Sequence, residues 1–137
     1  MLERENIQQR GFRNVVEGGS VTGFQVPLRS TYYRGVWLTQ LTQATITVDG
    51  EKFEGDKITW TISGKTYSQA DLAKYPNTHW RITEAAILTV KKPGGLKLGI
   101  HDVEVAYGYT SSYTPYPFAD SDMPRISTYK RKMTLAG

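Results

Sequence analysis

Apolar and polar residues alternate in two neighbouring stretches, 42–48 and 58–63, and this period of two limits the fold more than any other feature of the chain. The apolar positions are Ala44, Ile46 and Val48 in the first stretch and Ile58, Trp60 and Ile62 in the second. Threonines occupy the positions between them. Because successive side chains of a strand point to opposite faces, both stretches are predicted to be strands with one buried and one polar face.

Turn signals separate these strands from their neighbours. Asp49-Gly50 follows the first stretch directly and predicts a two-residue hairpin, because both central residues of a type I′ turn need a positive φ. We expect a second tight turn at Gly64-Lys65. Ser68 is placed to cap a short helical turn over residues 68–74, with Asp71 near the positive end of its dipole.

The rest of the chain follows the same logic. Further strands are predicted at residues 11–16, 21–28, 36–41, 86–90, 101–109 and 126–135. Short strands joined by turns, with at most one short helix, predict an all-β protein, an antiparallel β-sandwich of about eight or nine strands. A barrel is the competing architecture. A chain of 137 residues is expected to form one domain, residues 1–137.

Composition narrows the class of protein. The chain has no cysteine, which excludes disulfides and thiolate metal sites and agrees with a reducing compartment. Its first residues are charged and polar, and no run of about eighteen apolar residues occurs. We therefore expect a soluble, cytoplasmic protein that does not enter a membrane.

The net charge of +4 does not indicate a nucleic-acid-binding protein, because the basic residues are scattered. The one cluster is Lys130-Arg131-Lys132, in an alternating stretch where only every second residue shares a face. Binding to nucleic acid requires a broader basic stripe with aromatic residues on the same face. The cluster is interpreted as part of a solvated edge strand whose lysines hinder aggregation.

The two histidines are weak candidates for catalysis or metal binding. His101 precedes Asp102 and Glu104, but adjacent strand residues diverge, so a structural hydrogen bond at the start of the strand is favoured over a ligand role. His79 lies beside Trp80 in a predicted loop, where packing or exposure is commoner than function.

Two loop motifs are also interpreted structurally. Residues 93–96, Pro-Gly-Gly-Leu, lack the Gly-Lys-Ser/Thr ending and the following helix of a phosphate-binding loop, so a turn with Leu96 in the core is expected. Asp120 and Asp122 are two carboxylates in a predicted loop, which are usually solvated and seldom a cation site.

Aromatic residues gather in two stretches, and they are the strongest sign of a binding function. The first contains Tyr107, Tyr109, Tyr113, Tyr116 and Phe118 among glycines, serines and prolines. The second, residues 32–37, contains Tyr32, Tyr33, Arg34 and Trp37, and alternation leaves open which of its faces is core. Because Tyr, Trp and Arg dominate interface energetics, the chain is predicted to bind something and not to react alone.

Several segments, taken in order, resemble one protein family. They are YYRGV at 32–36, VDGEK at 48–52, PGGLK at 93–97 and GIHDVEV at 99–105, supported by GFRNV at 11–15 and SYTP at 112–115. This combination resembles the small β subunit of bacterial C-glycoside deglycosidases over nearly the whole chain. Each piece alone is common in sandwich domains, so the specificity lies in their order.

The resemblance implies a hetero-oligomer. In it a β-rich subunit binds a larger α subunit that looks like a sugar isomerase barrel and holds a divalent metal, usually taken as manganese. Such a complex is a carbon–carbon lyase that cleaves the bond between a 3-keto sugar and an aromatic, flavonoid-like aglycone. The resemblance places the acid, base and metal ligands in the partner, and so implies no catalytic residue, cofactor or metal site in this chain.

Our hypothesis is that one set of residues contacts the α partner or lines the substrate entrance. These residues are Tyr32, Tyr33, Arg34, Tyr113, Tyr116 and Phe118. A free-standing carbohydrate-binding sandwich and an assembly domain without a ligand are the alternatives. A self-sufficient enzyme has the least support, since neither histidine has a nucleophile or acid partner by spacing.

Overall fold

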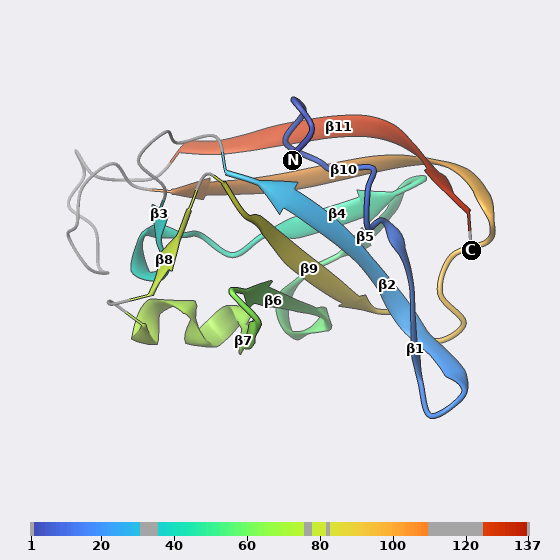
Figure 1. Cartoon of the computed structure of the whole chain (residues 1–137), viewed down its shortest axis with the longest axis horizontal. Helices are drawn as coiled ribbons and strands as arrows, with labels where there is room; N and C mark the ends of the chain where they lie inside the picture. Colours follow the sequence, from blue (N-terminus) through green and yellow to red (C-terminus); the bar gives the residue numbers. More distant parts are fainter. Residues whose placement is uncertain (1, 31–35, 76–77, 82, 110–124, 137) are drawn as a thin grey trace.

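Two antiparallel sheets pack face to face in the computed structural model, which describes residues 2–30, 36–75, 78–81, 83–109 and 125–136 (Figure 1). The five-stranded sheet has the order β1 (Arg13–Glu17), β2 (Ser20–Arg29), β9 (Ala85–Lys91), β6 (Ile58–Ile62) and β7 (Lys65–Ser68). The four-stranded sheet has the order β11 (Arg125–Leu135), β10 (Gly99–Tyr109), β4 (Thr45–Val48) and β5 (Glu51–Phe53). A separate ribbon pairs β3 (Val36–Trp37) with β8 (His79–Trp80). The predicted all-β antiparallel sandwich is confirmed, and the two sheets do not close into a barrel.

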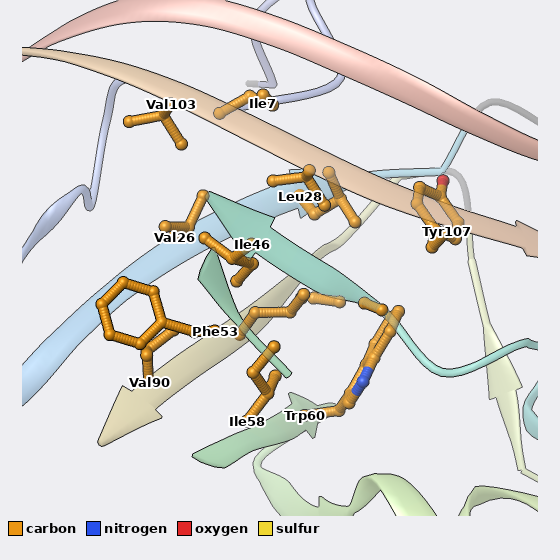
Figure 2. Close-up of a cluster of buried hydrophobic side chains, with 14 of the residues drawn as sticks. Ile7, Val26, Leu28, Ile46, Phe53, Ile58, Trp60, Val90, Val103 and Tyr107 are labelled. Carbon is orange, nitrogen blue, oxygen red and sulfur yellow. The ribbon is translucent and has the colours of Figure 1, made fainter. Parts of the chain in front are cut away.

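The alternating stretches supply the core between the sheets. The apolar residues predicted to point inward from them are buried, and Ile46 and Trp60 have no exposed surface. Figure 2 shows side chains of both sheets meeting in this layer. The rings of Phe24 and Phe53 lie 5.4 Å apart across it, between β2 and β5. Burial of one face of each sheet is therefore what holds the two layers together.

Tight turns set the register of the hairpins. Asp49 and Gly50 have φ angles of 49° and 90°, and Val48 pairs with Glu51, which confirms the predicted Asp-Gly hairpin. The second turn is centred one residue earlier than predicted, on Ser63 and Gly64. Their φ angles of 53° and 79° leave Lys65 as the first residue of β7.

The structure contains more strands than were predicted, because three of its strands are too short to show a periodic pattern. These are β5, β7 and β8, with two to four residues each. The predicted strand over residues 36–41 is wrong beyond Trp37, where the chain turns into the 3₁₀-helix η1 (Leu38–Gln40). The side-chain oxygen of Gln40 accepts the Trp37 N–H at 2.8 Å, which favours a turn over a continued strand.

The predicted helical turn forms as the 3₁₀-helix η3 (Gln69–Lys74). The Ser68 hydroxyl accepts the Asp71 N–H at 3.3 Å, as expected for a capping residue. Another short 3₁₀-helix, η2 (Gly55–Lys57), precedes β6. None of the helices in the described ranges has the length and hydropathy to cross a membrane.

Residues near the N-terminus close one side of the sandwich. Ile7 is buried in the core and forms a bridge with Leu28 of β2. The side-chain amide of Gln9 pairs with the backbone of Thr134 in β11, donating at 2.7 Å and accepting at 2.9 Å. The Gln9 side chain therefore forms hydrogen bonds with backbone groups on the open edge of β11, where no further strand pairs in the described residues.

Candidate functional site

The six residues predicted to contact a partner or substrate lie outside the described residues. They are Tyr32, Tyr33, Arg34, Tyr113, Tyr116 and Phe118. Asp120 and Asp122, weighed above as a cation site, also lie outside them. The structure does describe residues that flank these stretches.

The flanking residues of both aromatic stretches lie at the same end of the sandwich. Leu41, just after η1, forms a bridge with Tyr109, the last residue of β10. The Thr42 N–H donates to the Gly108 carbonyl at 2.9 Å, and the Gly108 N–H donates to the Thr42 hydroxyl at 2.8 Å. Figure 1 places the β3–β8 ribbon beside this end of β10. Chain segments about seventy residues apart in sequence are thus anchored together at what we call the aromatic end.

Buried rings form the base of the aromatic end. The Trp80 ring lies 5.9 Å from Trp60 and 6.0 Å from Tyr107, and Tyr107 lies 5.7 Å from Tyr129. Tyr107, the first ring of its stretch, is buried and belongs to the core. Its register explains this burial, because Val103, Val105 and Tyr107 share the inward face of β10. These packed rings form a rigid base beneath the aromatic end.

Trp37 and His79 form a pair on the outer side of this base. Their ring centroids lie 4.8 Å apart, and both side chains are half-buried. Of the three tryptophans, Trp60 and Trp80 are fully buried, whereas Trp37 reaches the surface. This pair could not be predicted from the sequence, because β3 and β8 have only two residues each and lie about forty residues apart. Of the two described residues of the second aromatic stretch, Val36 is buried and Trp37 is half-buried.

His101 has the structural role that its position predicted. The residue is 8% exposed, and its ring nitrogens lie 2.6 Å from Asp49 Oδ2 and 2.6 Å from the Lys97 carbonyl oxygen. Burial alone would lower the pKa of His101, but these two acceptors outweigh it and raise the pKa. Hydrogen bonds from His101 and from the Asp102 N–H lower the pKa of Asp49. No cluster of three or more His, Asp and Glu side chains suited to a metal occurs in the described ranges.

The basic cluster lies on the edge strand β11, as predicted. Lys130 and Lys132 share the outer face and face two acids of β10, with Lys130 Nζ 3.2 Å from Glu104 and Lys132 Nζ 3.7 Å from Asp102. They border an open hollow of about 550 Å³. Arg131 points the other way and binds Glu3 and the Ile7 carbonyl. The opposite charges across β10 and β11 neutralise one another, so the face is a mixed-charge surface and not a basic stripe.

The Pro-Gly-Gly-Leu motif is the predicted turn between strands. Gly94 and Gly95 have φ angles of 85° and 63°. The side chain of Asn14 bonds both the N–H and the carbonyl of Leu96, each at 2.9 Å. Leu96 is partly buried against the core, so the loop is fastened to β1 at this point.

Comparison with known proteins identifies the family. Residues 2–113 match the model of the family described as C-glycoside deglycosidase beta subunit. The chain belongs to this family. The matched range contains Tyr32, Tyr33, Arg34 and Tyr113 and ends before Tyr116 and Phe118. A resemblance first drawn from short motifs is thus confirmed.

Two relatives carry the same description. The chain is 47% identical to the C-glycoside deglycosidase beta subunit of Eubacterium cellulosolvens over 115 residues, which cover 83% of this chain and 78% of the relative. It is 29% identical to that of Arthrobacter globiformis over 62 residues, which cover 45% of this chain and 47% of the relative. The description as a beta subunit implies a partner subunit in a complex.

Proposed function

We propose that this chain is the non-catalytic subunit of a heteromeric C-glycoside deglycosidase, and that a larger α subunit carries the reaction. Membership of the beta-subunit family is the observation that supports this proposal. The α subunit is proposed to have a sugar isomerase-like barrel and to hold a divalent metal, with manganese the expected ion.

The proposed substrate is a C-glycoside whose sugar has been oxidised to a 3-keto sugar and whose aglycone is aromatic and flavonoid-like. The ketone acidifies the proton on the neighbouring C2, so a base can remove it while the bond from C1 to the aglycone carbon breaks. The leaving aglycone carbon takes up a proton, and the sugar keeps a new C1–C2 double bond. The metal in the partner would stabilise the negative charge that develops on the ketone oxygen. Two carboxylates acting on an ordinary O-glycoside do not supply this route.

The part of this chain proposed to bind the partner, or to line the substrate entrance, is the aromatic end. Tyr32, Tyr33, Arg34, Tyr113, Tyr116 and Phe118 belong to stretches whose described flanks meet there. Half-buried Trp37 and His79 add an aromatic surface at the same end. Large rings on a rigid base lose little entropy on binding, which suits both a protein partner and the flat face of an aglycone.

Alanine variants of the six predicted contact residues test this proposal in the reconstituted complex. A variant at a true anchor is expected to weaken binding of the α subunit, or turnover, by about tenfold or more, the range of interface anchors. Leu98→Ala is the matched control, because Leu98 is 67% exposed and precedes β10 at the opposite end. If all six variants bind and turn over as wild type does, the aromatic end is not the contact surface.

The carbohydrate-binding alternative is tested by the isolated chain. It requires measurable affinity for sugars without any partner. Titration calorimetry of the isolated chain with glucose separates the two functions, since the subunit proposal predicts no binding at millimolar sugar.

A further inference from the structure

Both nitrogens of the His101 ring face hydrogen-bond acceptors. Nδ1 lies 2.6 Å from Asp49 Oδ2, and Nε2 lies 2.6 Å from the carbonyl oxygen of Lys97. A backbone carbonyl can only accept, and so can a carboxylate in its ionised form. Because a neutral imidazole has one N–H, this geometry is satisfied only by the doubly protonated ring.

The ring joins two segments that are far apart in sequence. Asp49 is the first residue of the β4–β5 turn, and its second oxygen accepts the Asp102 N–H at 2.8 Å. Lys97 belongs to the loop between β9 and β10. Earlier positions of that loop have other anchors, since Gly94 donates to the Val21 carbonyl at 3.0 Å and Leu96 is bonded by Asn14. His101 binds the last part of the loop through the Lys97 carbonyl.

We propose that Asp49, His101 and the Lys97 carbonyl form a pH-sensitive latch that holds the end of the β9–β10 loop against the β4–β5 turn. The latch is closed when His101 carries both ring protons. When the ring loses one proton, a single donor remains for two acceptors. The remaining proton stays on Nδ1, where it donates to the anionic Asp49, because a charge-assisted hydrogen bond is stronger than one to a neutral carbonyl. The Nε2 lone pair then faces the Lys97 oxygen, and residues 97–98 are released.

The surroundings of the ring favour the closed state. Asp49 is the charged group in direct contact with it, and Asp102, next in the chain, pairs with Lys132 on the outer face. The Phe12 ring packs edge-on against His101, with the two ring centroids 6.4 Å apart. Met133 is the residue opposite His101 in β11. Both neighbours are uncharged. The pKa of His101 is raised above its ordinary value, in agreement with this geometry. The stabilisation is therefore present below the ordinary histidine pKa and is lost as pH rises through the pKa of the folded state.

The latch lies far from the aromatic end. His101 and Tyr109 occupy opposite ends of β10, which places them about 26 Å apart at a rise of roughly 3.3 Å per residue. Opening of the latch releases Leu98, which is already 67% exposed, and leaves the buried ring cluster in place. The latch is thus independent of the proposed contact with a partner.

Nuclear magnetic resonance of the full-length chain tests the latch directly. At pH 6 we expect both ring nitrogens of His101 to be protonated. As the pH rises past the midpoint, Nε2 should lose its proton, and the Lys97 carbonyl carbon should shift with the same midpoint. The Leu96 carbonyl carbon, which is bonded by Asn14, is the internal control and should not follow it.

Asp49→Asn provides the matched variant, because it keeps the size of the side chain and removes its charge. It is expected to lower the midpoint of His101 by about one pH unit or more. The His79 ring signals should stay in place, since His79 lies on β8. A His101 midpoint at or below the ordinary value of about 6.5, or a neutral ring protonated on Nε2, would overturn the proposal. So would a Lys97 carbonyl carbon that does not respond to pH.

Discussion

The side chain of Gln69 makes four hydrogen bonds inside the protein, and removing it should strongly destabilise the fold. Its oxygen accepts from the Ala44 N–H at 2.5 Å and from the Trp60 indole N–H at 3.0 Å. Its nitrogen donates to the carbonyls of Ala44 and Gly55 at 2.9 and 3.2 Å. Gln69 is 4% exposed, so its partners have little access to water. One amide thereby connects η3 to β6 and to the chain that leads into β4.

Gln69→Ala leaves two buried donors and two acceptors without their partner. Each unsatisfied donor costs about 1–3 kcal/mol, and partial rehydration of the cavity offsets some of the loss. We expect the free energy of unfolding to fall by about 3–5 kcal/mol, a large effect for a single substitution. Urea unfolding followed by tryptophan fluorescence measures it, with Trp60 next to the altered site.

A matched control separates this network from a general effect of losing a glutamine. Gln43 is exposed, so Gln43→Ala should change the free energy of unfolding by no more than about 0.5 kcal/mol. Gln69→Glu keeps the shape but directs a carboxylate oxygen at two carbonyls, so it should be unstable at neutral pH and partly recover in acid. The reasoning is refuted if Gln69→Ala stays within about 1 kcal/mol of wild type.

Three further predictions concern other parts of the fold. Gly23→Ala should lower the melting temperature sharply or prevent folding, because a Cβ there would lie 1.9 Å from the Val90 carbonyl oxygen. Calorimetry measures this effect, with Thr22→Ala as the control variant. Burial alone would raise the pKa of Glu3, but the Arg10 N–H and the Arg131 guanidinium outweigh it and lower the pKa, so its stabilisation is lost as pH falls through that lowered value. Acid unfolding of Glu3→Gln should therefore lack part of the wild-type pH dependence. Trp37→Ala should keep the fold, by circular dichroism, yet weaken binding of the α subunit if the aromatic end is the interface.

The sequence predicted the sandwich because its signals are local. Alternation around Ile46 and Trp60 reports which face is buried, and Asp49-Gly50 reports a turn that only a few residue types can form. Strands β5, β7 and β8 were missed because two to four residues are too few to show a period. Their places are set by pairing with neighbouring strands, which is a tertiary effect.

Polar contacts over long sequence distances could not be predicted. Gln69 and Ala44 are separated by twenty-five residues, and Gln9 and Thr134 by 125, so no spacing rule connects them. The role of His101 was predicted in kind, as a hydrogen bond at the start of a strand, but neither of its partners was named. The six proposed contact residues remain a prediction, since they lie outside the described residues.

The most direct test of the central claim is a turnover assay on this chain purified together with its α partner. Tagged chain is used to isolate a stoichiometric partner from the source organism, and a 3-keto C-glycoside is offered to each chain alone and to both together. The account predicts cleavage to the free aglycone only when both chains are present, with loss of activity when a chelator removes divalent metal and recovery when manganese is added. Cleavage by the partner alone at the same rate, or a chain that elutes alone or only with itself, would contradict it.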